Sequence, residues 1–361
     1  MNNSKHYFKS LTGIRAIAAI MVFLYHNRKY WRNDLPMPVM RLLSEFHTGV
    51  TLFFVLSGFL LAYRYKDEPL ESFKEYAKYL LLRVARIYPL YWLLLTAFFI
   101  DHAYSSKVTT YFLHYTLLYP LFDAYVLKGI AQAWSLGVEM WFYLFSPLLF
   151  LLLRKSLFKA LSFLALLLGL AWGIGFSLKM ANLNPHSLLY PLNFILGNTF
   201  FGRSLEFFMG MYLAYLMQNK TQLLSGLKLK YVTLTGSVLF MATIAAIALF
   251  AKNSFVHGVE TWQGRLLHET LLPVSVAVLF YGLLTEATLL SKFLSTRFMV
   301  LLGNASFAFY LVHISYFNLK LKELFFLPDN NFIVLWLCSI AIFMWIEKPL
   351  YELCRKWVAK I

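Results

Sequence analysis

The amino-acid sequence predicts an all-α membrane protein, a polytopic bundle of about ten transmembrane helices, and three observations lead to this fold class. Apolar residues make up 60% of the 361-residue chain and charged residues only 14%, against about 25% in an ordinary soluble domain. The apolar residues gather in runs of roughly 20, the length that an α-helix needs to cross a bilayer. A soluble fold of this size could not remove so much apolar surface from water.

Ten such runs predict ten spans within one integral-membrane domain, residues 1–361, with no fused soluble domain. A further apolar stretch at 111–127 is interrupted by Pro120 and Asp123, and we interpret it as an interfacial or re-entrant segment. The first run follows lysines, as in a signal peptide, but no small-residue cleavage site follows it, so we expect it to remain as an anchor. The predicted spans lie near residues 10–27, 46–65, 84–101, 134–153, 160–178, 204–217, 231–251, 269–285, 298–315 and 332–347.

The distribution of lysine and arginine orients these spans. When the ten spans cross the membrane in turn, most of the lysines and arginines fall on the same side as the N-terminus. Cytoplasmic loops are enriched in these two residues. Both termini are therefore expected in the cytoplasm. The net charge of +16 agrees with attraction to anionic lipid headgroups, and no basic patch with interleaved aromatic residues indicates a nucleic-acid partner.

The first predicted span carries two ionisable residues, Arg15 and His26, and such residues in spans are usually functional. They are eleven residues apart, which is three helical turns plus about 20°, so they share one face at a separation of about 16 Å. Ala18, Ala19 and Val22 lie between them and would leave a narrow groove. Two interpretations remain open: the cations flank a channel, or Arg15 obeys the positive-inside rule and His26 lies at the headgroups.

The third predicted span begins with a pair of arginines, Arg83 and Arg86. A spacing of three places both guanidinium groups on one face of a helix, where planar forks suit phosphate oxygens. The alternative is that both arginines only anchor the cytoplasmic end of the span.

Three further ionisable residues fall within or at the end of predicted spans, and two of them, Glu139 and His313, are expected on the outer side. Glu139 falls just inside the fourth span and needs a partner, for which His26 and Arg203 are candidates. Glu206 lies one turn from Arg203, which favours a structural ion pair. His313 ends the ninth span, where a histidine taken alone is more often interfacial than catalytic.

Several kinds of site are missing from the sequence. It contains no nucleophile elbow, no phosphate-cradling glycine loop and no cluster with metal-ligand spacing, so we expect no metal. Cys338 and Cys354 stand apart from each other and from other ligands, which favours packing roles.

Six segments in order carry a resemblance to a known family. They resemble the acyltransferase-3 family of integral-membrane O-acyltransferases, which modify sugars of bacterial envelopes and exported metabolites. The resemblance covers residues 11–350. The segments read LTGIRAIAAIMVFLYH, GVTLFFVLSGFL, RVARIYPLYW, WSLGVEMWFYLF, SLEFFMGMYLAYL and GNASFAFYLVH.

The family's motif of a basic residue, ten residues and a histidine falls on Arg15 and His26. Its Arg-x-x-Arg motif falls on Arg83 and Arg86, and the acid of its Trp-Ser-Leu motif falls on Glu139. The resemblance implies transfer of an acyl group, by default acetyl from acetyl-CoA, to a hydroxyl of an envelope glycan such as the O-antigen of lipopolysaccharide. The expected partners are this donor, a glycan or lipid-linked sugar, and the lipids of the bacterial inner membrane.

In the mechanism that the resemblance implies, His26 deprotonates the acceptor hydroxyl and Glu139 holds the other nitrogen of the ring. Arg83 and Arg86 bind the phosphates of coenzyme A, and Arg15 lines the path of the donor. A covalent acyl-histidine relay through His26 is the open alternative. His313 is a further accessory candidate.

One position departs from the family, because Thr51 stands where many members carry Asp. If that Asp orients a group or handles a proton in the family, either no residue has this role in the present chain or another residue has it. The rival class is a transporter or flippase of an anionic lipid-linked substrate, which ten spans would suit, although no internal repeat is visible. A purely structural protein would leave the paired His and Arg residues unexplained. Aromatic residues expected in outward loops to stack on sugar rings are Tyr30, Trp31, Tyr104 and Trp262.

Overall fold

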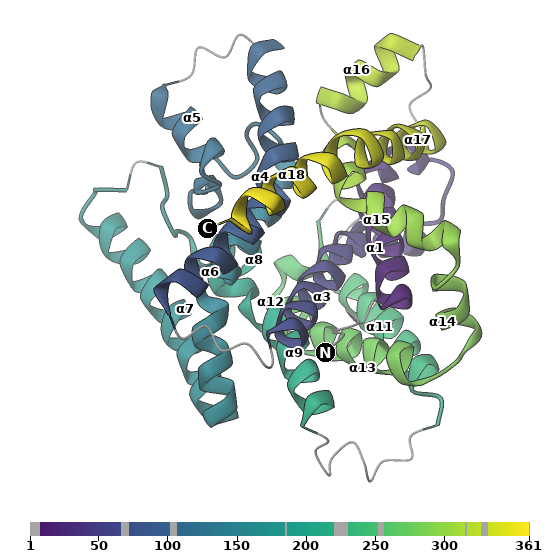
Figure 1. Cartoon of the computed structure of the whole chain (residues 1–361), viewed down its shortest axis with the longest axis horizontal. Helices are drawn as coiled ribbons and strands as arrows, with labels where there is room; N and C mark the ends of the chain where they lie inside the picture. The colour runs from purple at the N-terminus through teal and green to yellow at the C-terminus, as the bar shows by residue number, and fades with distance from the viewer. Residues whose placement is uncertain are drawn as a thin grey trace. The chain divides into compact units, whose positions relative to one another are not determined.

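The computed structural model shows regular elements that are all helical (Figure 1). Among the described residues, one isolated bridge joins Phe122 and Leu188. The predicted all-α class is therefore confirmed for the part of the chain that the structure describes, which comprises residues 8–65, 72–101, 107–184, 186–219, 230–251, 256–314, 316–325 and 331–360.

Seven helical segments in these ranges are long and apolar enough to cross a membrane. An eighth is reached if α15 (Arg297–Val312) and α16 (Tyr316–Phe325), which are bent at the break between them, count as one broken span. Two of the ten predicted spans, α1 (Lys9–Asn27) and α9 (Phe200–Gln218), are helices whose charged residues lower their hydropathy. The seven segments are Met37–Arg64, Phe73–Asp101, Ala131–Lys155, Leu157–Met180, Val232–Leu249, Trp262–Thr285 and Phe332–Val358.

The chain divides into two compact units. Unit 1 comprises residues 1–63, 208–309 and 328–340, and unit 2 comprises residues 64–207, 310–327 and 341–361. The helix α9 begins in unit 2 and ends in unit 1. The other elements that lie wholly or mostly in unit 1 are α1, η1 (Arg28–Trp31), α2 (Met37–Ser44), η2 (Glu45–Thr48), α3 (Gly49–Arg64), α11 (Val232–Leu249), η5 (Gly258–Glu260), α12 (Trp262–Leu266), the π-helical turn η6 (Leu267–Leu271), α13 (Leu272–Thr285), α14 (Leu289–Leu294), α15 and α17 (Phe332–Ile342).

In unit 1, α1 is held by close backbone contacts and by aromatic packing. A Cβ atom at Gly13 would lie 2.0 Å from the carbonyl oxygen of Leu294, and one at Gly303 would lie 1.9 Å from that of Thr12. Only glycine allows helices to approach this closely. Phe23 of α1 packs against the Phe332 ring at 5.0 Å between centroids. The position of α1, which carries Arg15 and His26, is therefore set by α14, α15 and α17.

Unit 2 is built around two long helices, α4 and α6. Phe142 of α6 stacks on Phe207 of α9 at 4.3 Å between ring centroids, and α18 packs along α4. The elements are α4 (Phe73–Asp101), α5 (Val108–Tyr115), η3 (Tyr119–Leu121), η4 (Ala131–Ala133), α6 (Trp134–Lys155), α7 (Leu157–Met180), α8 (Leu192–Asn198), α16, the π-helical turn η7 (Phe343–Glu347) and α18 (Lys348–Val358).

The start of α4 corrects the predicted third span, which we placed at 84–101. The helix begins at Phe73, where Ser72 and Glu75 form a capping box. The backbone N–H of Ser72 donates to Glu75 Oε2 at 3.0 Å, and that of Glu75 donates to Ser72 Oγ at 3.2 Å. These bonds satisfy two donors that a helix start would leave open. The arginines at 83 and 86 therefore lie inside the helix and not at its first turn.

The stretch 111–127 forms short elements, α5 and η3, and none of the span-length helices. Its fold is held by His114, whose Nδ1 lies 2.8 Å from the Thr110 carbonyl oxygen and whose ring stacks on Tyr119 at 4.4 Å. An interfacial or re-entrant location, as predicted, stays an interpretation.

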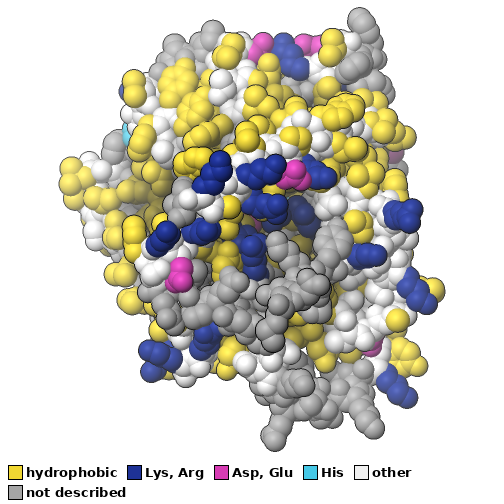
Figure 2. Space-filling view, in the orientation of Figure 1, with side chains coloured by type: hydrophobic (Ala, Val, Ile, Leu, Met, Phe, Trp, Pro, Cys, Tyr) yellow, Lys and Arg dark blue, Asp and Glu magenta, His cyan; other side chains and the backbone are white. Residues whose placement is uncertain are grey.

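The surface agrees with a membrane protein. Figure 2 shows apolar side chains spread over the visible face, on which Lys and Arg are more frequent than Asp and Glu. The helix α7 is the clearest case, because only 17% of its most apolar stretch is buried. Its exposed large side chains include Phe158, Leu166, Leu170, Trp172, Ile174, Phe176 and Met180. A helix that is apolar on all sides and exposed in this way suits a lipid environment.

Candidate functional site

In unit 1, Arg15 and His26 lie on one unbroken helix, as predicted, and both are half-buried. The predicted groove between them is filled. Ala18 and Val22 are at most 2% exposed, and a Cβ atom at Gly49 would lie 2.6 Å from the Ala18 carbonyl oxygen. The start of α3 therefore packs on this face, because the small side chains that suggested a groove also allow a neighbouring helix to come close.

His26 lies at the edge of a group of aromatic and polar side chains that the sequence did not suggest. The ring of His26 contacts that of Tyr25 edge-on at 4.5 Å, and the Tyr25 ring lies 5.4 Å from His47 and 5.5 Å from His257. His268 stacks on His47 at 6.0 Å. We refer to Tyr25, Glu45, His47, His257 and His268 as the histidine cluster.

Main-chain groups orient the histidine cluster. Nδ1 of His47 lies 3.1 Å from the Ser44 carbonyl oxygen, and Nδ1 of His257 lies 3.2 Å from the same atom. Glu45 is fully buried, and its Oε1 accepts a hydrogen bond from the backbone N–H of Gly258 at 2.6 Å. Burial lowers the pKa of His257, and the positive charge of Arg28 lowers it further, so this ring is neutral at pH 7.

The sequence offered only a weak signal for this cluster. Glu45 and His47 are two residues apart, but His257 lies in a different loop more than 200 residues later. No local spacing joins them, so only the tertiary structure could reveal that they meet.

In unit 2, the two arginines of α4 have different environments. Arg83 is buried, with its guanidinium carbon 5.5 Å from the ring centroids of Tyr65 and Tyr79 and 5.7 Å from that of Tyr143. Its Nη2 donates to the Tyr65 hydroxyl at 3.1 Å. Arg86 is exposed. A spacing of three residues leaves an offset of about 60° around the helix, which is enough to bury one side chain and expose the other.

Tyr143 connects Arg83 to Glu139. Its hydroxyl donates to Glu139 Oε1, one turn earlier on α6. Tyr79 is tied to the same helix, because its hydroxyl bonds to Ser146 Oγ at 2.7 Å. Arg83 and Glu139 were expected at opposite membrane faces, but they belong to one arginine–tyrosine network, made of Tyr65, Tyr79, Arg83, Glu139 and Tyr143.

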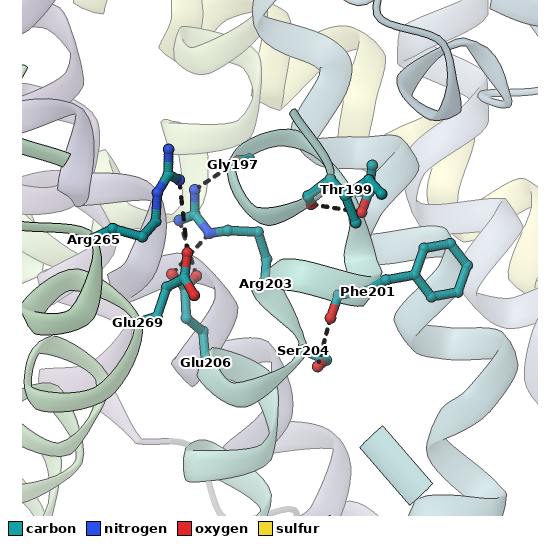
Figure 3. Close-up of polar contacts among 9 residues, drawn as sticks. Gly197, Thr199, Phe201, Arg203, Ser204, Glu206, Arg265 and Glu269 are labelled. Atoms are coloured by element: carbon teal, nitrogen blue, oxygen red, sulfur yellow. Dashed lines mark hydrogen bonds and ion pairs between the residues drawn. The ribbon is translucent and has the colours of Figure 1, made fainter. Parts of the chain in front are cut away.

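The predicted ion pair between Arg203 and Glu206 is present (Figure 3). Nε of Arg203 donates to Oε1 of Glu206 at 2.8 Å, and Nη2 donates to Oε2 at 3.0 Å. Nη1 donates to the Gly197 carbonyl oxygen at 3.2 Å. Both side chains are nearly fully buried, and a two-bond fork is the strongest geometry for such a pair. The pairing of Glu139 with His26 or Arg203 stays a prediction.

His313 is fully buried, whereas the sequence favoured the membrane interface. Its Nδ1 lies 2.8 Å from the Tyr310 carbonyl oxygen. The Tyr310 hydroxyl donates to the Gln132 carbonyl oxygen at 2.9 Å, and Gln132 Nε2 donates to the Leu311 carbonyl oxygen at 2.7 Å. His313 therefore lies beside bonds that tie the end of α15 to η4, directly before α6.

The remaining predicted residues have varied environments. Thr51 is fully buried in α3. Of the aromatic residues expected in outward loops, Trp262 is 72% exposed, Tyr30 and Trp31 are half-buried, and Tyr104 lies outside the described residues.

Comparison with known proteins gives consistent results. A family model described as an acyltransferase domain matches residues 8–347. The chain is 35% identical over 150 residues to a protein of Acidianus two-tailed virus named "Putative acetyltransferase ORF330", an alignment that covers 40% of this chain and 42% of that protein. It is 38% identical over 96 residues to "Protein 2 in picA locus" of Rhizobium radiobacter, covering 26% of this chain and 46% of that protein.

The chain thus spans less than half the length of each of these two relatives. No solved structure matches it. The family model, by contrast, covers almost the whole chain, including every motif position considered above. The protein belongs to the acyltransferase-3 family, and the described part of the chain has seven helical segments that are long and apolar enough to cross a membrane.

Proposed function

We propose that this protein transfers an acetyl group from acetyl-CoA to a hydroxyl of an envelope glycan, such as the O-antigen of lipopolysaccharide. We further propose that it works in the bacterial inner membrane as a single domain, with both termini in the cytoplasm. The observation that carries the proposal is the family match over residues 8–347, a range that includes Arg15 and His26. The half-buried ring of His26 beside Tyr25 supports a role in chemistry.

His26 acts as the general base. An alcohol is a poor nucleophile at neutral pH, and a histidine has a pKa close to the operating pH. The ring takes the hydroxyl proton as the acceptor oxygen attacks the thioester carbonyl carbon. The carbon–sulfur bond then breaks, and the sulfur of coenzyme A leaves with the proton that His26 returns. In the alternative, the His26 ring itself attacks the thioester carbonyl carbon and the thiolate of coenzyme A leaves. The acetyl group on the ring is then transferred to the acceptor hydroxyl.

Glu139 stabilises the charged form of the ring in this mechanism. Glu139 accepts a hydrogen bond from the Tyr143 hydroxyl, which favours one orientation of its carboxylate. Tyr143 in turn rests on Arg83, so the network supports a rigid placement of the acid.

The donor is bound through its phosphates by the arginines of α4. The exposure of Arg86 makes it the arginine that reaches the phosphates. Arg83, held by three rings, fixes this part of α4 and adds positive charge. Arg15 adds positive charge that favours the anionic donor, because α3 fills the face of α1 between Arg15 and His26 and leaves no groove for the pantetheine arm there. His313 remains an accessory candidate.

The acceptor is proposed to be a lipid-linked or exported glycan at the outer face of the inner membrane. Trp262, with its exposed indole, suits stacking on a sugar ring. Blocking export of the lipid-linked glycan tests this point, because full acetylation of the trapped intermediate would place the reaction before export and contradict it.

The proposed activity is tested with purified protein in lipid nanodiscs. Release of the coenzyme A thiol from acetyl-CoA should depend on added glycan acceptor, and mass spectrometry should find the acetyl group on that acceptor. His186 is an exposed histidine in unit 2, so His186→Ala is the matched control for His26→Ala. If no acyl-CoA supports glycan-dependent thiol release by the intact protein, the proposal is wrong.

A further inference from the structure

Two distant segments of unit 1 bring three potential ligand atoms together. Glu45 and His47 come from η2, and His257 lies directly before η5. One carboxylate oxygen and one nitrogen of each ring all lie within 4.8 Å of one another. Two imidazoles and one carboxylate form a ligand set that proteins use for zinc and for other divalent transition metals.

The carboxylate of Glu45 provides a second, independent observation. Glu45 is 0% exposed. The Gly258 N–H donates to its Oε1, but its Oε2 is buried and has no hydrogen-bond partner among the residues that the structure describes. A buried carboxylate oxygen without a donor or cation is costly, and a bound cation would remove that cost.

The orientation of the two rings is a third observation. The carbonyl oxygen of Ser44 lies at hydrogen-bond distance from Nδ1 of both His47 and His257. A ring that donates its Nδ1–H to a carbonyl keeps the lone pair of Nε2, and metal-bound histidines are commonly held in this way. Nε2 of His257 lies 3.3 Å from the Tyr25 hydroxyl, so Tyr25 borders the position that the ion would take.

We propose that Glu45, His47 and His257 bind one divalent transition-metal ion, with zinc as the first choice for this ligand set. The ligand atoms lie within 4.8 Å of one another, and tetrahedral bonds of about 2.0–2.2 Å bring such atoms to about 3.4 Å, so the side chains must close around the ion. Three protein ligands leave one coordination position open. The site is independent of the proposed function, because its occupancy is measured without activity. The sequence predicted no metal because its ligands are separated by more than 200 residues.

The competing explanation is that Arg28 alone compensates the charge of Glu45. Arg28 donates to the Tyr25 carbonyl oxygen at 2.7 Å and lies over the Tyr25 ring at 4.4 Å. If it were the counterion, Arg28→Met would destabilise the protein and no metal would be present. Under our proposal, Arg28→Met keeps the metal.

The test is the metal content of protein purified without a polyhistidine tag, loaded with zinc and dialysed, measured by inductively coupled plasma mass spectrometry. We expect about one zinc per chain in the parent and in the control His186→Ala. We expect at least a tenfold loss in Glu45→Gln and in His257→Ala. Equal zinc in all four proteins, or less than about one tenth of an ion per chain in the parent, would overturn the proposal.

A measurement on the parent protein alone covers the case in which the variants do not fold. X-ray absorption at the zinc edge should show nitrogen and oxygen ligands near 2.0–2.2 Å, with the outer-shell scattering of two imidazoles. Sulfur ligands, or a shell of water oxygens only, would show that the ion is bound elsewhere or adventitiously.

Discussion

The histidine cluster of unit 1 and the arginine–tyrosine network of unit 2 bury charge in opposite ways. Around Arg83, three tyrosine rings and one hydroxyl surround the cation. Around Glu45, one backbone N–H donates to one carboxylate oxygen, and in the described part of the chain the other oxygen has no hydrogen-bond partner. The network compensates a cation with aromatic rings and one hydroxyl, although Nε of Arg83 has no hydrogen-bond partner among the described residues. The cluster instead brings a buried carboxylate and two imidazoles together, a set that can bind a cation.

The largest effect that would sharpen this comparison is expected at His26, beside the cluster. His26→Ala should reduce transfer at least about 100-fold, since a general base typically contributes 10²- to 10⁴-fold. The thermal midpoint of unfolding should change little, because the ring of His26 is only half-buried. Thiol release and a thermal melt measure the two quantities, with His186→Ala as the control. Activity within a few-fold of the parent would remove His26 from the mechanism.

The network should show the reverse behaviour. Arg83→Lys keeps the charge but loses the planar group that lies against three rings, so we expect a loss of about 2 kcal/mol in stability. Arg86→Lys is the matched control and should change stability by less than about 0.5 kcal/mol because its side chain is exposed. Thermal melts in the same detergent measure both. Equal, small losses would break the distinction between the two arginines.

A smaller effect is expected from the link between the network and Glu139. Tyr143→Phe removes the hydroxyl that donates to the Glu139 carboxylate, and the expected loss is about 1.5 kcal/mol. Tyr231→Phe, which changes a side chain that is 71% exposed, provides the control. A Tyr143→Phe protein as stable as this control would mean that the bond to Glu139 contributes no net stability.

The smallest effect is expected at Glu286, which differs from Glu45 because both of its carboxylate oxygens accept hydrogen bonds. Glu286 accepts from the backbone N–H groups of Val232 and Thr233 at 2.7 Å each and from the Thr233 hydroxyl at 2.6 Å. It thereby caps the start of α11. These bonds, with that of the Thr233 hydroxyl first, lower the pKa of Glu286.

A lowered folded-state pKa means that Glu286 stabilises the protein above its ordinary pKa, and that this contribution is lost as the pH falls through the folded-state value. Glu286→Gln should therefore cost about 0.5–1 kcal/mol at neutral pH and flatten the fall in stability below about pH 4.5. Glu352→Gln, at an exposed position, should keep the parent's pH profile. An unchanged profile in Glu286→Gln would show that the cap does not titrate with folding.

Much of the fold could be predicted from the sequence, because hydropathy and periodicity are local. The runs at 134–153 and 160–178 agree closely with α6 and α7. The predicted third span began at residue 84, whereas α4 begins at Phe73, because we interpreted the polar residues of its first turns as a loop. The capping box formed by Ser72 and Glu75 stabilises a helix start at this polar segment.

The candidate site was less predictable, for the same reason. The pair Arg203–Glu206 was found because both partners lie on one helical turn. The burial of Arg83 depends on tyrosines from three segments, and the histidine cluster depends on a loop far along the chain. Contacts between distant segments leave no periodic trace in a single sequence.

The exposed helix α7 also sets a mechanical relation to the bilayer. Its 24 residues extend about 36 Å at 1.5 Å per residue, whereas the hydrocarbon core is about 30 Å thick. A helix that is too long must tilt or thicken the lipid around it. Because so little of α7 is buried against protein, the lipid contributes strongly to its tilt, and membranes of different thickness would hold this helix at different angles.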